Sequence, residues 1–151
     1  MDQRPEESST LSSSSVEIVL IPTEGVERLW PIAAPLLEKA TKRTRKIDLS
    51  SLRECALDGS MQLWLAYDSE EDGVIASMAT EIVTYTSGLK SARILLFGGL
   101  HLNRWASMIA TVEKWALYEG CSTVEMVGRR GWGRVYPDYL PLEYWYSKEI
   151  A

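Results

Sequence analysis

The stretch that decides the fold is residues 92–127, which read ARILLFGGLHLNRWASMIATVEKWALYEGCSTVEMV. It opens with a run typical of a strand, Ala92–Phe97, which ends in a pair of glycines. An amphipathic pattern then predicts a helix over Asn103–Glu119, and a second strand pattern follows at Thr123–Val127. A strand, a glycine turn, a helix and a strand in this order bring the helix N-terminus up to a site for an anionic ligand. We expect a right-handed parallel crossover connection.

The helix in this stretch is the most clearly predicted element of the chain. Its apolar residues recur at intervals of three and four and form one stripe: Trp105, Met108, Ile109, Val112, Trp115 and Ala116. Gly120 follows as a natural helix stop. The stripe predicts a helix that packs one face against a sheet.

Strand patterns occur on both sides of this stretch. Three of them should form an antiparallel meander: Met61–Tyr67, Val74–Thr86 and Lys90–Phe97. A first strand is expected at Val16–Pro22 and a last one at Leu142–Ile150. The predicted order is β-α-α-β-β-β-α-β-α-β. We therefore expect a mixed α/β fold (α+β), with a largely antiparallel sheet, one parallel crossover and helices on both faces.

Two helices are expected between the first two strands. The first contains Pro31 and Pro35, which remove backbone donors and predict a kinked or two-part helix. The second covers Ser51–Asp58, with a capping box formed by its first residue and Glu54. Gly59 then provides a C-terminal stop.

Length and composition limit the possible classes of protein. The chain has 151 residues, 46% of them apolar, which suits one domain. We assign residues 16–151 to that domain, and the Ser-rich residues 1–15 to a flexible arm rather than to a secretory signal. A net charge of −5 argues against a specific nucleic-acid binder. No apolar run approaches the ~20 residues of a membrane span, so we expect no membrane partner.

Other features of the composition leave alternatives open. Cys55 and Cys121 are interpreted as free thiols in a reducing compartment, so the expected location is cytoplasmic. No pair of Cys/His motifs has zinc spacing, so we expect no metal. The basic cluster Lys42–Lys46 is either a solvated loop or a contact for phosphate or an acidic partner. The six tryptophans serve mainly the core, but a protein partner or a second copy could meet exposed aromatics and the N-terminal arm.

The element order resembles that of the GNAT superfamily of N-acetyltransferases over residues 16–150. The predicted long helix, Gly120-Cys121 and the strand after them are similar to the central helix, glycine turn and fifth strand of that family. Val135–Tyr139 stands where the family often has a run like Leu-Tyr-Glu-Lys-Leu. In texture the chain is also similar to short GNAT-like proteins of tailed bacteriophages and prophages. The resemblance implies a GNAT-like fold with acetyl-CoA as cofactor, and a location in the host cytoplasm or virion if the chain is phage-encoded.

The chain departs from this family at the helix entry. The family signature there is Arg/Gln-x-x-Gly-x-Gly/Ala, whose backbone N–H groups hold the pyrophosphate of acetyl-CoA. Residues 98–106 read GGLHLNRWA instead, with both glycines next to the strand, although close approach to a phosphate favours residues without a Cβ. Two hypotheses follow. One is an acyl-CoA-dependent N-acetyltransferase with an eroded binding motif. The other is a non-catalytic GNAT-fold module for binding or assembly, such as a bacteriophage virion component or a host-interaction protein.

Candidate cofactor-binding residues follow from the resemblance and lie along the strand end and the helix entry: Arg93, Leu95, Leu96, Phe97, Gly98, Gly99, His101, Asn103 and Arg104. The main chain of the strand residues would hold the pantetheine arm, and N–H groups from Gly99 to Arg104 would hold the pyrophosphate. His101 is the only histidine, and at a helix N-terminus it would be kept neutral as an anion contact, a base or a structural residue. Asn103 is most simply a helix N-cap.

Two residues are candidates for catalysis. Tyr136 falls on the tyrosine that many members of the family use as a general acid, and a phenol can protonate a leaving thiolate. Its alternative role is packing beside Tyr139 and Tyr144. Glu81 lies in a predicted strand next to the expected substrate cleft, where a carboxylate can take a proton from an amine directly or through water. Its alternative role is that of an outward-facing strand residue.

Overall fold

The computed structural model describes residues 15–100, 107–128 and 131–151. The described elements follow one another along the chain as β1 (Val16–Ile21), α2 (Thr23–Thr41), α3 (Leu49–Asp58), β2 (Gln62–Asp68), β3 (Gly73–Thr84), β4 (Lys90–Gly99), α5 (Met108–Tyr118), β5 (Thr123–Met126) and α6 (Trp132–Val135). All but the last residue of the expected N-terminal arm lies outside the described residues.

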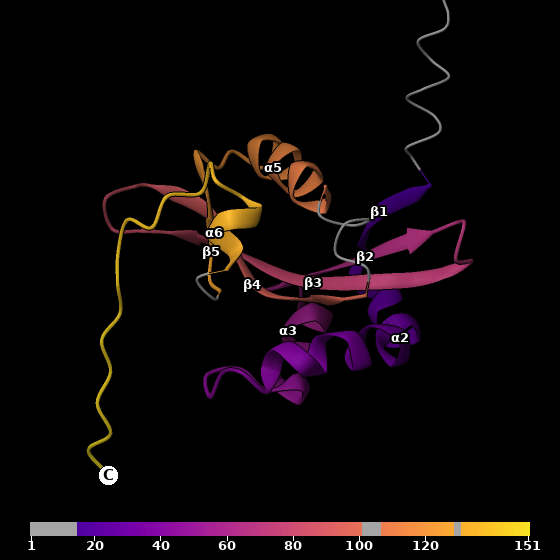
Figure 1. Cartoon of the computed structure of the whole chain (residues 1–151), viewed down its shortest axis with the longest axis horizontal. Helices are drawn as coiled ribbons and strands as arrows, with labels where there is room; N and C mark the ends of the chain where they lie inside the picture. The colour runs from indigo at the N-terminus through magenta and orange to yellow at the C-terminus, as the bar shows by residue number, and fades with distance from the viewer. Residues whose placement is uncertain (1–14, 101–106, 129–130) are drawn as a thin grey trace, which may run out of the picture.

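The strands form one sheet in the order β1-β2-β3-β4-β5. The first three pairings are antiparallel and the pairing of β4 with β5 is parallel. Helices α2 and α3 lie on one face of the sheet, and α5 and α6 lie on the other (Figure 1). The expected mixed fold, largely antiparallel with one parallel connection and helices on both faces, is confirmed.

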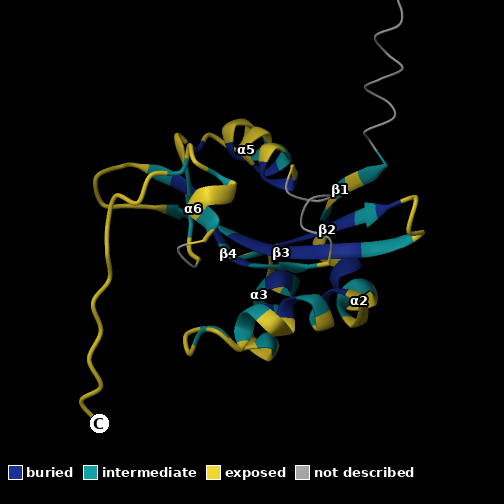
Figure 2. Cartoon of the chain, in the orientation of Figure 1, coloured by how far each residue is buried: buried dark blue, intermediate teal, exposed yellow. Residues whose placement is uncertain are grey.

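Each face of the sheet carries its own apolar core, and buried segments, dark blue in Figure 2, lie on both sides of the sheet. On one face α2 and α3 contribute Val26, Ala33, Leu37, Leu52 and Ala56, which pack on residues of β2, β3 and β4. On the other face α5 contributes Met108, Ile109 and Val112, which pack on Trp64, Met78 and Ile94. The spacing of three and four in α5 is what places its apolar residues on one side. The apolar stripe predicted from the sequence is therefore the face that α5 buries.

The ends of two helices differ from the expected ones. Helix α3 begins two residues earlier than predicted, because the carboxylate of Asp48 accepts a hydrogen bond of 2.9 Å from the Ser51 N–H and caps the helix. The capping box expected at Ser51 and Glu54 is therefore wrong. Gly59 ends the helix with a positive φ of 86°, as predicted. Helix α5 begins at Met108, later than the predicted Asn103, which lies outside the described residues.

Helix α2 runs unbroken through Pro31 and Pro35, so an interruption into two helices is wrong. The two prolines are four positions apart and both are exposed, so they share the outer face of the helix. Carbonyl groups that lose their partners on that face can bond to water, which lowers the cost of keeping the helix continuous.

The strand predicted at Leu142–Ile150 is wrong, because residues 140–151 have no regular secondary structure. Their large side chains are exposed, from 67% for Tyr144 to 92% for Tyr146. The segment contacts the loop after α2, where Lys46 lies 4.8 Å from the ring centre of Trp145 and Arg45 pairs with Glu149. An alternating pattern creates two faces, but a strand also needs a neighbouring strand, which no described residue supplies here.

Within the described residues, no helix has the length and apolar character to cross a bilayer. The same residues hold no cluster of three side chains able to bind a metal ion.

Candidate functional site

The parallel strands β4 and β5, at the centre of the predicted site, separate after Ile94. The pairing of β4 with β5 runs from Ser91 opposite Thr123 to Ile94 opposite Met126. The Val127 N–H then donates to the Ile94 carbonyl at 3.0 Å. Beyond this point β4 continues to Gly99 with β3 as its only partner strand among the described residues. The two strands therefore separate beside Leu95, Leu96 and Phe97, three of the candidate cofactor-binding residues.

A β-bulge lies where the strands part. Thr80 of β3 pairs with Ile94, and the preceding Ala79 pairs with Leu96, so Leu95 has no partner in the register. A bulge bends its strand, ends regular pairing and re-aims the residues that follow. Leu95 is therefore the structural cause of the gap between β4 and β5.

The bulge also decides which main-chain groups face the gap. The carbonyl of Ile94 faces β5, whereas the N–H of Leu100 donates to Ile75 of β3 at 2.8 Å. In an uninterrupted strand, the main chains of residues an even number of positions apart face the same neighbouring strand. Ile94 and Leu100 are six positions apart but face opposite neighbours, so the bulge between them has reversed the direction of the main-chain groups. Counting back from Leu100, the main chains of Phe97 and Gly99 face the gap. Both are candidate cofactor-binding residues, and their contact with a ligand stays a prediction.

Gly98 and Gly99 have a packing reason to lack side chains. A Cβ on Gly98 would overlap the carbonyl oxygen of Leu36 in α2. A Cβ on Gly99 would lie 2.6 Å from the Cβ of Ala76 in β3. The glycine pair thus lets α2 and β3 approach β4 closely, which is independent of any ligand.

Aromatic side chains line the α5 side of the gap. The ring of Phe97 stacks on Trp132 with centroids 4.9 Å apart, and Trp132 lies 6.0 Å from the ring of Tyr136. Tyr139 meets Tyr136 edge to face at 6.2 Å. Gly128 gives the indole its place, because a Cβ there would come within 2.5 Å of Trp132. Tyr136, at the end of α6, therefore lies close to Phe97, with the two ring centroids 6.4 Å apart. The structure brings these two predicted site residues together.

The two phenols of this aromatic group are held in their protonated form. Burial raises the pKa of Tyr136 to about 12. Burial, together with the hydrogen bond that its hydroxyl donates to Glu113 at 2.5 Å, raises the pKa of Tyr139 as well. At neutral pH both hydroxyls are therefore proton donors.

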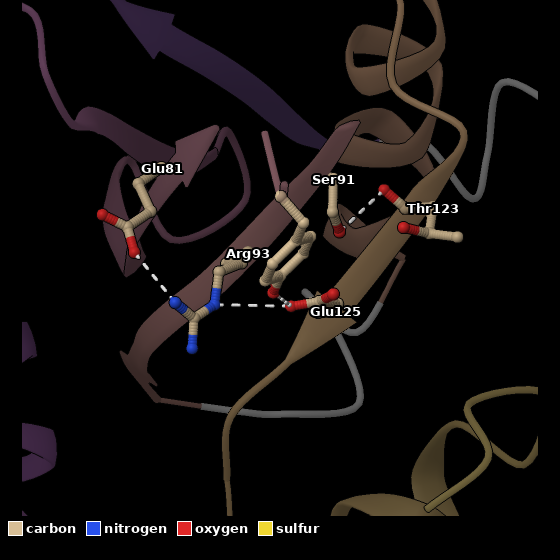
Figure 3. Close-up of polar contacts among 6 residues, drawn as sticks. Glu81, Ser91, Arg93, Thr123 and Glu125 are labelled. Atoms are coloured by element: carbon tan, nitrogen blue, oxygen red, sulfur yellow. Dashed lines mark hydrogen bonds and ion pairs between the residues drawn. The ribbon is translucent and has the colours of Figure 1, made fainter. Parts of the chain in front are cut away.

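Glu81 and Arg93 lie on the opposite face of the sheet from Tyr136. Their side chains form an ion pair of 3.4 Å, and Arg93 also reaches Glu125 of β5 (Figure 3). Arg93 precedes Ile94, which packs on α5, so alternation turns the guanidinium to the α2 and α3 side. The structure does not bring Glu81 to the aromatic group.

The remaining predicted residues are a core residue, the bulge residue and three that are not described. The side chain of Leu96 is buried in the core under α2, and Leu95 is the bulge residue. His101, Asn103 and Arg104 lie outside the described residues. Their predicted contacts with a pyrophosphate stay predictions.

Several residues of this region were missed by reasoning from the sequence: Tyr85, Glu113, Glu125 and Trp132. The contact of Tyr136 with Tyr139 was expected as its packing role. The sequence predicted a short helix or an irregular turn at Gly131–Tyr139, and the structure has α6 there, but the stack of Trp132 on Phe97 was not predicted. The sequence signal for the Trp132 stack is Gly128, four residues earlier. Without a Cβ at this position, the indole can pack directly against the main chain. Two cavities of the described residues lie elsewhere, and one of them, about 400 Å³, is beside the loop after α2.

Solved structures share this fold at low sequence identity. An aminoglycoside acetyltransferase from an uncultured soil metagenomic sample matches with a TM-score of 0.67 and 8% identity, over 91% of this chain and 97% of that one. A ribosomal-protein-alanine N-acetyltransferase from Brucella melitensis biovar Abortus matches with a TM-score of 0.61 and 17% identity, over 90% and 99% of the two chains. A GNAT family acetyltransferase from Staphylococcus aureus matches with a TM-score of 0.63 and 17% identity, also over 90% and 99%.

No protein-family model and no curated protein matches this chain. At these identities the likeness establishes the fold alone, which is the GNAT fold.

Proposed function

We propose that this chain is an acyl-CoA-dependent N-acyltransferase with acetyl-CoA as its donor. The observation that carries the proposal is the bulged β4, whose main chain at Phe97 and Gly99 faces a gap that β5 has left. Solved structures with the same fold bear acetyltransferase names, which supports the same chemistry for this gap.

The donor fits the gap through its pantetheine arm. That arm is a narrow chain with two amide groups, and amides pair well with the main chain at the edge of a strand. The N–H and carbonyl groups of Phe97 and Gly99 would bind it much as a neighbouring strand would. Most of the segment expected to hold the pyrophosphate, from His101 to Arg104, lies outside the described residues, so the proposal depends on the arm.

The reaction joins an acceptor amine to the acyl group. The amine nitrogen attacks the thioester carbonyl, the C–S bond breaks, and the amine proton passes to solvent while the thiolate leaves. In this proposal Tyr136 helps the departure of the sulfur, which its ring position 6.4 Å from the ring of Phe97 supports. Because its pKa is about 12 and an ordinary thiol has a pKa near ~8.5, complete proton transfer is unfavourable. We therefore assign Tyr136 a hydrogen bond to the developing thiolate. Glu81 receives no catalytic role, because its carboxylate is paired with Arg93 on the other face.

A binding or assembly module without catalysis is the second candidate, for instance a phage virion component or a host-interaction protein. The observation that favours it is the exposed aromatic segment at residues 144–146. Large exposed aromatics are typical of surfaces that meet a protein partner.

Calorimetric titration with acetyl-CoA separates the two candidates. The enzyme should bind with a Kd in the micromolar range, equivalent to about −8 kcal/mol. Coenzyme A without the acetyl group is the control, because it shares the arm and should bind in the same range. An absence of binding at millimolar acetyl-CoA would refute the acyltransferase. Light scattering then tests the module, which predicts an assembly larger than the monomer or a copurifying partner.

A further inference from the structure

We propose that Arg93 is a positioning residue that fixes β5 against β4 and so sets the place where the two strands part. This inference deepens the proposed function and rests on it. The residues concerned are Arg93 with its two carboxylate partners Glu81 and Glu125, together called the Arg93 clasp.

The clasp crosses three strands at one level of the sheet. Arg93 Nη1 lies 3.4 Å from Glu81 Oε2 in β3, and Arg93 Nε lies 3.4 Å from Glu125 Oε1 in β5. Figure 3 shows the guanidinium between the two carboxylates. The same Glu125 oxygen accepts a hydrogen bond of 2.7 Å from the Tyr85 hydroxyl. The carboxylate of Glu125 is therefore held from two sides.

The clasp lies directly before the gap. Arg93 is opposite Glu125 in the register, and the next pair, Ile94 with Met126, is the last before the strands separate. The other side-chain hydrogen bonds of β4 in this region are at the far end of the ladder. There Ser91 donates to the Thr123 carbonyl at 3.2 Å, Ser122 donates to the Lys90 carbonyl at 3.5 Å, and Lys90 donates to the carbonyl of Glu119, at the end of α5, at 2.6 Å. Among the described residues, only the clasp ties β5 to β4 by side chains at the gap end.

The two carboxylates of the clasp depend on the positive charge of Arg93 between them. The three side chains are between 24% and 34% exposed, so water screens them only in part. The Nε of Arg93 is buried and has an ion-pair distance to Glu125 without hydrogen-bond geometry. Charge attraction is therefore what this contact contributes. Without the guanidinium, two partly buried carboxylates would be left without a counter-charge.

The two arms of the clasp have different neighbours. On the Glu81 side, β4 pairs with β3 on both sides of Arg93, from Lys90 to Gly99, so the ion pair is one contact of a long ladder. On the Glu125 side, β5 is a short edge strand whose pairing ends at the next residue. Loss of Glu125 should therefore loosen the gap, whereas loss of Glu81 should not. This asymmetry supplies a matched control.

The test compares Glu125→Gln, Arg93→Met and the control Glu81→Gln. We expect the first two to raise the KM and Kd for acetyl-CoA about tenfold, which is about 1.4 kcal/mol, with kcat within about twofold of wild type. Glu81→Gln should leave the KM unchanged, and Arg93→Lys should restore part of the loss. Equal KM values for Glu125→Gln and Glu81→Gln would overturn the proposal. If Arg93→Met does not fold, the comparison of the two glutamate variants still decides.

Hydrogen exchange in the ligand-free protein keeps this test separate from the proposed function. The Val127 N–H, which donates to Ile94, should exchange faster in Glu125→Gln and Arg93→Met than in Glu81→Gln. Unchanged protection of that amide would refute the clasp even if acetyl-CoA binds. If the wild type does not bind acetyl-CoA but the amide responds as expected, the proposed function fails and the clasp remains.

Discussion

Deleting Leu95 is the sharpest perturbation of the proposed site. Leu95 is the β4 residue without a partner in the β3 register, so its removal leaves Ile94 and Leu96 in plain alternation. The strand then loses its bend, and β5 can continue its pairing with β4 past Met126. We expect the variant to fold, since the pairing of the other β4 residues with β3 is kept.

The expected loss of binding follows from the main-chain groups that face the gap. The main chains of Phe97 and Gly99 face the gap, and we count one hydrogen bond to acetyl-CoA from each. One hydrogen bond contributes about 0.5–1.5 kcal/mol to the free energy of binding. Losing both weakens acetyl-CoA binding by about 1–3 kcal/mol, which raises the Kd about 5-fold to 150-fold. Deletion of Thr86, in the turn between β3 and β4, removes one residue without touching the bulge and is the control.

Calorimetry measures the Kd and a circular dichroism melt shows that the variant is folded. The control deletion should bind acetyl-CoA as the wild type does. A folded Leu95 deletion that keeps the wild-type Kd would show that the bulge does not make the site.

Two further predictions concern the glycine pair and the phenol. Gly98→Ala places a Cβ against the Leu36 carbonyl and should lower stability by about 2 kcal/mol, or the Tm by about 4–8 °C, whereas Gly131→Ala meets nothing and should change neither; equal melts would contradict the packing explanation. Tyr136→Phe should lower kcat with an unchanged Kd for acetyl-CoA, and an unchanged kcat would remove the residue from the mechanism. Because burial raises the pKa of Tyr136 from 10.0 to about 12, the wild type loses stability as the pH rises through this window, and the Phe variant should lose less in alkaline melts.

The fold could be predicted because the periodicities of this chain are clear. Residues 92–127 switch from a strand pattern to a helix pattern and back, and the structure has β4, α5 and β5 there. The three strands expected as a meander are β2, β3 and β4, paired in that order. Patterns of this kind depend only on which side chains must be buried. They therefore predict the type and order of the elements even where the exact ends and contacts are not known.

The ends of elements were harder because several residues compete for the same role. Asp48 and Ser51 are both good N-cap residues, and the sequence does not show which of them caps the helix. The structure selects Asp48, whose carboxylate binds both the N–H and the hydroxyl of Ser51. These hydrogen bonds also lower the pKa of Asp48, since they favour its charged form. The failed strand at Leu142–Ile150 has a related cause, because alternation cannot show whether a partner strand is present.

The site itself could be predicted only in part, and the reason is the run Ile94–Phe97. It reads ILLF, apolar at every position, so no alternation shows where an extra residue enters the strand. In an unbulged strand Phe97 would lie on the face opposite Ile94, under α2. With Leu95 as the extra residue, Phe97 joins Ile94 on the α5 face and stacks on Trp132. The same residue that parts β4 from β5 thus also brings Phe97 and Tyr136 together, so the gap and its aromatic wall have one structural cause.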